Sequence, residues 1–490
     1  MRKSGILMPV FSLPGPYGIG CFGKQAYKFV DFLEAAGQKL WQILPLGPTS
    51  YGDSPYQSFS TFAGNPYFID LEELVRRGWI REKELPACSF GDTDRYIDYG
   101  LLYKNRMAVL KRAFLNSHME KDEGFQVFCH ENESWLPDYA LFMAVKELHQ
   151  GKSFSCWEEP IRLRRPEALK EYREKCKKEI LFYEFLQYLF DDQWKKLKSY
   201  ANGKGIQIIG DLPIYVALDS ADTWACPELF QLNEDLTPRA VAGCPPDAFS
   251  ATGQLWGNPL YDWEYHKKTG YDWWIRRFAQ SFKLYDIVRI DHFRGFDEYY
   301  AIPYGDATAE HGQWMPGPGY ELFRSMKEAL GQKQIIAEDL GYLTPSVLKL
   351  VQKTGYPGMK VLQFAFGGGA ENPYLPHNYQ RNCIVYTGTH DNDTTSGWYR
   401  TLKRKEKAEV RKYFHVHRGA DMNWMMILAA QASVADTVVI PMQDYLGTGS
   451  DTRINLPSTL GDNWKWRMYE EEITAELAGR ILDITRTYGR

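Results

Sequence analysis

Short apolar runs rich in β-branched residues recur along the chain, and most of them lead into charged or turn-forming residues. A run bounded in this way is typical of a strand that is buried on both faces. The clearest run contains Ile287, Val288 and Ile290, and a cluster of charged residues follows it. Eight strands are predicted, over residues 6–11, 39–44, 206–215, 287–290, 334–341, 359–364, 383–393 and 437–442.

The segments between these runs mostly have the apolar periodicity of amphipathic helices. Residues 71–200 are too long for one crossover helix, so they are predicted to form a mainly helical insertion between the second and third strands. Residues 221–265 are rich in glycine, proline and aromatic residues, which predicts a loop-rich insertion after the third strand. Because eight strands alternate with helical segments, residues 1–490 are predicted to form a single α/β protein, a (β/α)8 TIM barrel with inserted subdomains.

The charge and the aromatic content of the chain indicate which kinds of molecule it can bind. The net charge is -4 and the pI is near 6.3, whereas nucleic acids and anionic membranes attract basic surfaces, so neither is expected as a partner. Aromatic residues make up 15% of the chain, with 15 Trp and 32 Tyr. Their flat apolar faces and polar edges suit sugar rings. A neutral substrate is therefore expected.

Two further features indicate the compartment. The eight cysteines are scattered without a Cys-x-x-Cys pair, which favours free thiols in a reducing environment. The first residues lack the apolar core of a signal peptide, and no apolar run approaches the ~18 residues that span a bilayer. A cytoplasmic protein is expected, and the sequence carries no signal of its number of subunits.

Gly18, Gly20 and Gly23 have the Gly-x-Gly-x-x-Gly spacing of dinucleotide-binding proteins. That fingerprint requires the glycines directly after the first strand and an acidic residue at the end of the second strand. Here residues 12–17 intervene, and the second strand leads into Pro45 without a carboxylate. A bound dinucleotide is not expected, and neither is any other cofactor.

Acidic residues end three of the predicted strands. Asp291, Glu338 and Asp391 end the fourth, fifth and seventh strands, and the C-terminal ends of barrel strands meet at one mouth. Side chains alternate along a strand, so Arg289 and Asp291 point to the same side. Alone, Arg289 and Asp291 could be a structural ion pair, but three acids at one mouth favour a catalytic role.

Three carboxylates without a Cys/His ligand cluster favour glycosidic-bond chemistry. A retaining mechanism uses one ionised carboxylate as nucleophile and one protonated carboxyl as acid. Arg289 is predicted to hold the pKa of Asp291 low, and neighbouring carboxylates are predicted to raise the pKa of Glu338. Asp291 is then the nucleophile and Glu338 the acid/base. Asp391 is predicted to bond sugar hydroxyls and to stabilise the oxocarbenium-like transition state.

The alternative use of these acids is to bind a divalent metal, which prefers oxygen ligands. Arg289 would compete with such a metal for Asp291, so no metal site is predicted. His292 and His390 each adjoin a candidate acid. His390 is the better candidate for a sugar contact, and His292 is the better candidate for a packed support.

Several motifs between Ser4 and about Arg467 carry a family resemblance: Ser12-Leu-Pro-Gly-Pro-Tyr-Gly-Ile-Gly, Gly52-Asp-Ser-Pro-Tyr-Gln-Ser, Gly210-Asp-Leu-Pro-Ile-Tyr-Val, Pro245-Pro-Asp, Trp256-Gly-Asn-Pro, Arg289-Ile-Asp-His-Phe-Arg-Gly, Ala337-Glu-Asp-Leu-Gly and Gly388-Thr-His-Asp-Asn-Asp-Thr. On these motifs the chain resembles the 4-α-glucanotransferases called amylomaltases or disproportionating enzymes, relatives of the α-amylase barrels. Each motif alone is weak, and together they are highly specific.

The resemblance implies the same roles for Asp291, Glu338 and Asp391. It adds contacts around the cleaved sugar from Tyr56, Asp211, Arg289 and His390, and contacts along the glucan groove from Ser54, Trp256 and Asn463. It implies maltooligosaccharides and α-1,4-glucans as substrates, with the 4-hydroxyl of glucose or another glucan replacing water as acceptor.

One departure from the family is visible, because Gly367-Gly-Gly369 stands where the family often has acidic residues. The contacts that acidic residues make there are not expected in this chain. The alternative within enzymes is an α-1,4-glucan hydrolase on the same barrel. A non-catalytic glucan-binding protein would keep the aromatic residues and lose an acid, whereas all three acids are present.

Overall fold

The computed structural model describes residues 2–50, 52–85, 88–246, 250–341, 343–417, 419 and 421–490. Residues 247–249, which include the aspartate of the Pro245-Pro-Asp motif, therefore lie outside the described residues.

Eight parallel strands close into a barrel in the order β1-β12-β11-β10-β9-β6-β3-β2. They are β1 (Lys3–Leu7), β2 (Leu40–Gln42), β3 (Gln207–Leu212), β6 (Ile287–Ile290), β9 (Ile335–Ala337), β10 (Gly358–Val361), β11 (Cys383–Tyr386) and β12 (Thr437–Pro441). Each overlaps a predicted strand, so the predicted (β/α)8 barrel is confirmed. Most strands are shorter than predicted, because the polar residues that follow them leave the sheet and form loops at the barrel mouth.

An apolar cluster fills the barrel interior, and every strand contributes to it: Leu7, Leu40, Ile209, Ile287, Ile336, Met359, Ile384, Tyr386 and Val439. Side chains alternate along β6, so the face that begins with Ile287 continues with Arg289 and Asp291. Val288 and Ile290 face outwards and join the main core between the strands and the helices. The interior therefore changes from apolar to charged towards the mouth.

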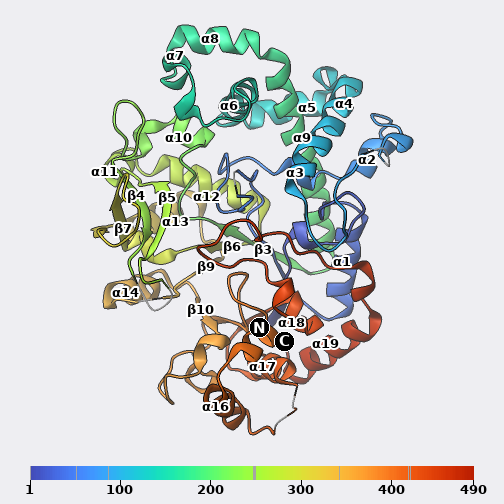
Figure 1. Ribbon diagram of the computed structural model, residues 1–490, viewed down its shortest axis with the longest axis vertical. Helices are drawn as coiled ribbons and strands as arrows, with labels where there is room; N and C mark the ends of the chain where they lie inside the picture. The colour runs from blue at the N-terminus through green and yellow to red at the C-terminus, as the bar shows by residue number, and fades with distance from the viewer. Residues whose placement is uncertain are drawn as a thin grey trace.

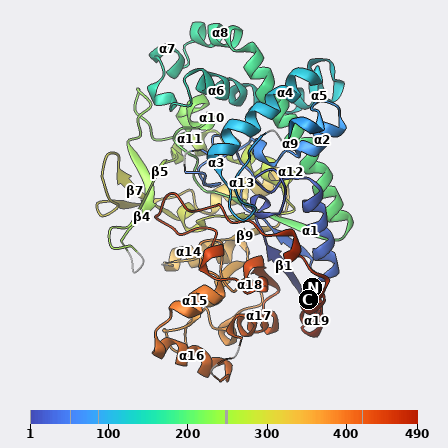
Figure 2. The same ribbon diagram turned by 45° about the vertical axis from the view of Figure 1, so that its right-hand side comes forward.

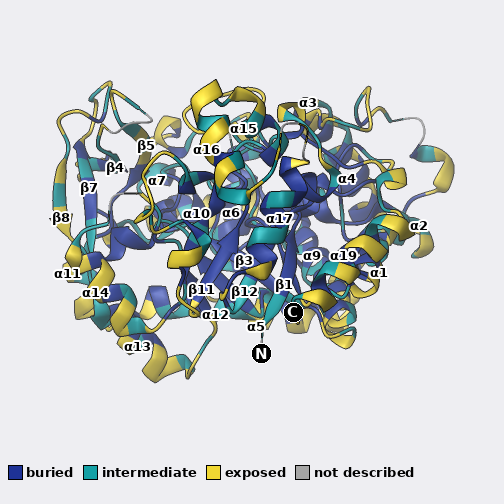
Figure 3. Cartoon of the chain, turned by 90° about the horizontal axis from the view of Figure 1, so that it is seen from below, coloured by how far each residue is buried: buried dark blue, intermediate teal, exposed yellow. Residues whose placement is uncertain are grey.

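Helices that follow the strands surround the barrel, so that Figure 3 shows buried strands at the centre and exposed residues on the outer helices. These helices are α1 (Lys24–Ala35), α9 (Lys177–Gly203), α11 (Trp263–Lys268), α12 (Asp272–Leu284), α13 (Tyr320–Leu330), α14 (Pro345–Thr354), α15 (Thr395–Thr401), α16 (Arg404–Phe414), α17 (Met422–Ala432), α18 (Met442–Leu446) and α19 (Ala475–Thr487). Between β10 and β11 the fully described connection contains only the 3-10 helices η9 (Leu362–Ala365) and η10 (Pro376–Asn378). Within the described part of the chain, no helix is long and apolar enough to cross a bilayer.

A group of helices between β2 and β3 extends to one side of the barrel, as Figures 1 and 2 show. It contains α2 (Leu71–Arg76), α3 (Tyr99–Leu101), α4 (Met107–Ser117), α5 (Glu123–Glu131), α6 (Leu136–Leu148), α7 (Glu159–Arg162) and α8 (Pro166–Lys175), and it leads into α9. The buried Lys146 of α6 forms an ion pair with Asp219 in the loop after β3, and its ammonium lies 4.8 Å from the centre of the Phe59 ring. These contacts attach the helices to loops at the barrel mouth.

A four-stranded antiparallel sheet, which the sequence analysis missed, lies beside the barrel. Its order is β5-β4-β7-β8, with β4 (Ala240–Cys244), β5 (Gln254–Pro259), β7 (Glu298–Pro303) and β8 (Gln313–Pro316). Strands β4 and β5, with α10 (Ala221–Ala225), occupy the segment for which mainly loops were predicted. The sheet combines strands that precede β6 in the sequence with strands that follow it, because β4 pairs with β7.

The Gly-x-Gly-x-x-Gly motif has a packing explanation. A Cβ atom on Gly18 would lie 2.1 Å from the carbonyl oxygen of Phe90, and one on Gly20 would lie 2.0 Å from that of Val10. The backbone approaches its neighbours so closely that only glycine fits. Close packing of the loop therefore accounts for these glycines without a ligand.

Candidate active site

The turns after β6 and β9 lie together because the two strands are neighbours in the barrel. Asp291 directly follows β6 and Glu338 directly follows β9. The backbone N–H of Glu338 donates to the carbonyl of Ile290 at 3.1 Å, and the N–H of Phe293 donates to the carbonyl of Glu338 at 3.0 Å. Asp391 lies in the loop after β11, and its charge contributes to raising the pKa of Asp291 after the larger effect of burial. The three candidate acids therefore meet at one mouth.

Arg289 divides its contacts between two carboxylates. Its Nη1 donates to both oxygens of Asp211 at 2.7 Å and to Oδ1 of Asp291 at 3.1 Å. Asp211 lies on the adjacent strand β3, and both Asp211 and Arg289 are buried. The Tyr56 hydroxyl donates to Oδ2 of Asp211 at 2.7 Å. Asp211 thus has the several hydrogen bonds that a buried carboxylate needs.

Burial raises the pKa of Asp291 to about 7 and the pKa of Glu338 to about 8. Arg289 lowers both, whereas Asp211 raises the pKa of Asp291 and Asp291 raises that of Glu338. The low pKa predicted for Asp291 is therefore wrong, because burial and the neighbouring carboxylates outweigh Arg289. The raised pKa predicted for Glu338 is found. Close carboxyls of this kind titrate as a pair that shares a proton.

Two backbone N–H groups hold the Glu338 carboxyl. His292 donates to Oε2 at 2.7 Å, and Leu340 donates to Oε1 at 3.0 Å. His292 has the left-handed conformation, with φ 47° and ψ 51°, which is uncommon outside glycine and is found at functional turns. Its ring packs edge-on against the Trp256 ring, with the ring centres 4.9 Å apart. Burial lowers the pKa of His292 to about 4, so the ring is a neutral packed group.

The loop after β12 holds Asp391, a contact that the sequence analysis did not predict. Asn455 Nδ2 donates to Asp391 Oδ1 at 2.6 Å, and Arg453 Nη2 donates to the Asp391 carbonyl at 2.5 Å. His390 Nε2 lies 3.3 Å from the same Oδ1. The sequence did indicate that polar residues follow the eighth predicted strand, as they follow the other strands, but it did not indicate which of them contact Asp391.

Aromatic rings form one side of the mouth. Tyr56 stacks on His390 with ring centres 5.3 Å apart, and Trp464 lies 5.8 Å from Tyr56 and 6.0 Å from His390. Burial raises the pKa of Tyr56 and lowers that of His390, so both are neutral at pH 7. Sequence reasoning missed Trp464, although the residue before it was a candidate.

The other three candidates lie at the edges of this group. Trp256 is half-buried on β5 and contacts the site through the His292 ring. Ser54 Oγ accepts a hydrogen bond from the Tyr56 N–H at 3.2 Å and so fixes the turn that carries Tyr56. Asn463 hydrogen-bonds within its own loop, where its Oδ1 accepts from the Leu456 N–H at 2.9 Å. The structure thus gathers at the mouth Tyr56, Asp211, Arg289, Asp291, Glu338, His390 and Asp391.

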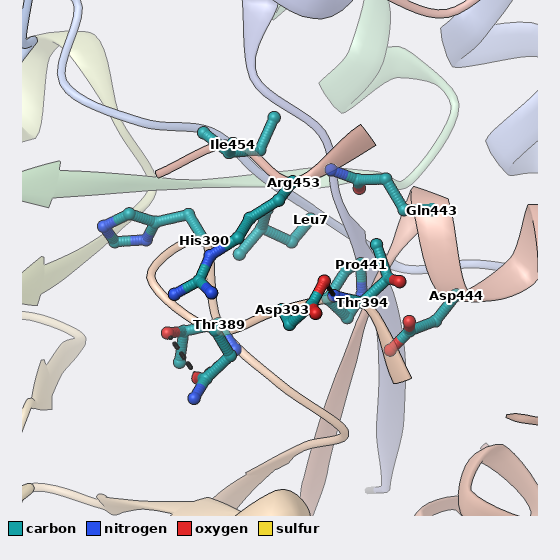
Figure 4. Close-up of a pocket in the computed structure, with 11 residues that line it drawn as sticks. Leu7, Thr389, His390, Asp393, Thr394, Pro441, Gln443, Asp444, Arg453 and Ile454 are labelled. Atoms are coloured by element: carbon teal, nitrogen blue, oxygen red, sulfur yellow. Dashed lines mark hydrogen bonds between the residues drawn. The ribbon is translucent and has the colours of Figure 1, made fainter. Parts of the chain in front are cut away.

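Figure 4 shows a small cavity behind the loop that carries His390 and Asp391. Its volume is about 10 Å³, and its polar lining includes Thr389, Asp393 and Arg453. A cavity of this size holds about one water molecule. It is therefore too small for a sugar ring.

Two half-buried carboxyls with raised pKa values can supply a nucleophile and an acid in the same site. In the ranges that the structure describes, no group of three or more His, Cys, Asp and Glu side chains is arranged to hold a metal ion. The described geometry therefore suits acid/base and nucleophilic chemistry by carboxyl groups.

Comparisons with known proteins agree with this chemistry. A sequence model of 4-alpha-glucanotransferases matches residues 8–472. The 4-alpha-glucanotransferase of Clostridium butyricum is 53% identical over 99% of this chain and 100% of its own length. That of Streptococcus pneumoniae is 48% identical over 100% of this chain and 97% of its own.

Solved structures extend the comparison to three dimensions. The amylomaltase of Streptococcus agalactiae, solved in complex with acarbose, has a TM-score of 0.97 and 45% identity, with 100% of each chain covered. The amylomaltase of Corynebacterium glutamicum shares the fold, with a TM-score of 0.81 at 19% identity over 99% of this chain and 75% of that one. The predicted transferase activity is confirmed over the hydrolase alternative, and the chain belongs to the 4-alpha-glucanotransferase family.

Proposed function

We propose that the enzyme cleaves an α-1,4-glucan and transfers one segment to the 4-hydroxyl of glucose or of another glucan, with retention of configuration. Maltooligosaccharides are the proposed donors. The observation that carries the proposal is the pair formed by Asp291 and Glu338, which directly follow adjacent strands and whose pKa values are both raised, chiefly by burial. The proposed chemistry requires no metal or cofactor.

In the first step, Asp291 attacks the anomeric carbon of the donor while Glu338 gives its proton to the departing 4-oxygen. The bond from the anomeric carbon to the glycosidic oxygen breaks, and an ester bond to Asp291 forms. Arg289 already holds Oδ1 of Asp291, which leaves Oδ2 as the attacking oxygen. The higher pKa of Glu338 suits it to be the protonated partner at the start.

In the second step, the Glu338 carboxylate removes the proton from the 4-hydroxyl of the acceptor. The acceptor oxygen attacks the anomeric carbon, and Asp291 leaves as a carboxylate. Backbone N–H bonds from His292 and Leu340 stabilise the charged form of Glu338 in this step. Glu338 therefore alternates between acid and base without changing its position.

Asp391 is proposed to bind sugar hydroxyls and to stabilise the positive charge that develops at the anomeric carbon. Tyr56, Asp211, Arg289 and His390 surround the sugar at the cleaved bond in this proposal. The groove beyond it is assigned to Ser54, Trp256 and Asn463, with Trp256 as a face for stacking a sugar ring. Loops that exclude water would favour the sugar acceptor.

Incubation of the pure enzyme with maltotriose tests the proposal. Transfer yields glucose and a ladder of longer maltooligosaccharides, whereas maltose and glucose alone would refute it. Asp291→Asn and Glu338→Gln are each expected to lower turnover by several orders of magnitude with the fold retained, as measured by circular dichroism. Near-parental turnover in either variant would refute its assigned role.

A further inference from the structure

Two residues of the loop after β12 hold the His390–Asp391 segment at three points. Asn455 N donates to the His390 carbonyl at 3.1 Å, and Arg453 Nη2 donates to the Asp391 carbonyl at 2.5 Å. Asn455 Nδ2 donates to Asp391 Oδ1 at 2.6 Å. Arg453 Nε also donates to the Asn455 carbonyl at 2.7 Å, so the two residues support each other. Both the main chain and the carboxylate of Asp391 are thereby fixed.

These contacts occupy only one oxygen of the Asp391 carboxylate. Asn455 donates to Oδ1, and His390 Nε2 lies 3.3 Å from the same atom. Within the described residues, no hydrogen bond to Oδ2 is found, and 44% of the Asp391 side chain is exposed. The amide of Asn455 therefore orients the carboxylate with Oδ2 free for a ligand at the open side of the mouth.

Arg453 supplies positive charge without using a carboxylate oxygen. Both of its hydrogen bonds go to main-chain carbonyls, those of Asp391 and Asn455. Burial lowers the pKa of Arg453, and the charges of Asp393 and Asp391 oppose this shift. Figure 4 shows the guanidinium near His390 and Thr389. An arginine in this position remains charged and attracts the Asp391 carboxylate.

We propose that Arg453 and Asn455 are positioning residues: the charge of Arg453 and the amide of Asn455 hold the Asp391 carboxylate and direct its Oδ2 towards the hydroxyls of the sugar at the cleaved bond. The inference rests on the transition-state role proposed above for Asp391. A group that acts mainly in the transition state affects kcat more than KM. Replacing Arg453 or Asn455 is therefore expected to change kcat more than KM.

The first test replaces Asn455 by alanine. A hydrogen bond to a charged group contributes about 1.5–3 kcal/mol, so kcat with maltotriose is expected to fall about 10- to 100-fold, with KM changed by less than about threefold. The melting temperature is measured in parallel to show that the variant folds. Asp451→Asn, which removes an exposed charge from the same loop, is the matched control and is expected to keep parental kcat.

Three results separate the two proposals. Parental kcat in Asn455→Ala together with an inactive Asp391→Asn would overturn the positioning role and leave the proposed function intact. An active Asp391→Asn would overturn both. A higher KM at unchanged kcat would make Asn455 a substrate contact and would also overturn the positioning role.

The second test uses pH, because a second carboxylate placed beside Asp391 would bind a proton in a pH-dependent way. The groups that face the Asp391 carboxylate are His390 from its own loop, Arg453 and Asn455 from the loop after β12, Asp291 from the turn after β6 and Tyr56 from the loop after β2. In Asn455→Asp the new carboxylate repels Asp391 at high pH, whereas one shared proton restores the hydrogen bond at lower pH. The ratio of variant to parental kcat is therefore expected to rise as the pH falls. A ratio that stays constant with pH would refute the proposal.

A third comparison isolates the charge of Arg453. Arg453→Lys keeps the charge and loses the fork that bonds two carbonyls, whereas Arg453→Gln loses the charge. The lysine variant is expected to retain at least about threefold more kcat. Equal losses in the two variants would overturn the electrostatic part of the proposal.

Discussion

Replacing Asp291 by asparagine is expected to stabilise the folded enzyme at alkaline pH while abolishing its activity. Burial raises the pKa of Asp291 from 3.8 to about 7, so the folded state resists ionisation of this group. Asparagine has nearly the same shape and can still accept a hydrogen bond from Arg289, but it cannot ionise. Asp291, the proposed nucleophile, is therefore predicted to reduce the stability of the native fold at alkaline pH.

The size of this effect follows from the pKa values. Each pKa unit corresponds to about 1.4 kcal/mol, which sets an upper limit of about 4 kcal/mol for the three units between 3.8 and 7. Since 27% of the side chain is exposed and Glu338 shares the proton, we expect about 1–2 kcal/mol. Unfolding of a chain of 490 residues has an entropy of about 1 kcal/mol/K, so the melting temperature rises by about 1–2 °C.

The predicted gain in stability of Asp291→Asn over the parent increases with pH. Below about pH 4 the carboxyl is protonated in both the folded and the unfolded chain, so asparagine offers no advantage. As the pH rises from 3.8 towards 7, the unfolded chain ionises first and the folded parent loses stability relative to the variant. The full advantage is present above about pH 7.

Scanning calorimetry of parent and Asp291→Asn at pH 4.5 and pH 8.5 measures this difference at one scan rate. Asp451→Asn, which removes an exposed carboxylate, is the control and is expected to show no such pH-dependent gain. A melting temperature for Asp291→Asn at pH 8.5 equal to or below that of the parent would refute the reasoning. An equal gain at both pH values would also refute it, because the gain would then not depend on ionisation.

Three further variants test other parts of the structure. Asp211→Asn removes a charge that raises the pKa of Asp291, so the acidic limb of the kcat/KM profile is expected to move to lower pH by up to about one unit, and an unmoved limb would contradict this. Asp219→Ala leaves the Lys146 ammonium buried without its carboxylate, which is expected to lower the free energy of unfolding in urea by about 3–5 kcal/mol. Adding Lys146→Met should recover part of this stability, and a further loss of stability would argue against the ion pair. Trp256→Ala removes the proposed stacking face and is expected to raise KM about tenfold with a smaller change in kcat, so unchanged steady-state KM would count against that face.

The barrel and its three acids could be predicted because the relevant signals are local in sequence. Apolar runs identify the strands, and Asp291 and Glu338 directly follow the last strand residues. The rule that the C-terminal ends of barrel strands meet at one mouth then brings these acids together without any further information. Local pattern and barrel geometry were sufficient for this part of the site.

The parts that were not predicted depend on contacts between distant segments. Arg289 is two residues from Asp291, but it also donates to both oxygens of Asp211, 78 residues earlier. The pKa of Asp291 therefore could not be predicted from its neighbours in the sequence. Asn455 reaches Asp391 across 64 residues, and no periodicity or motif encodes that contact.

The antiparallel sheet illustrates the same difficulty with strands. Its members are short, and β4 pairs with β7 across the whole of α11, α12 and β6. Glycine and proline in residues 240–259 favour loops by local criteria. Pairing with a later segment overrides this preference, and such pairing has no signature in residues 221–265 alone.

The order of strands in this sheet sets a rule for building chimeric enzymes. Strands β4 and β5 precede β6 in the chain, whereas β7 and β8 follow it, so the sheet assembles around the strand that carries Asp291. A crossover that exchanges only residues 221–265 with a relative would pair foreign β4 with native β7 and bring mismatched side chains together across that pair. Crossover points before residue 221 and after residue 316 exchange both halves of the sheet together with Asp291.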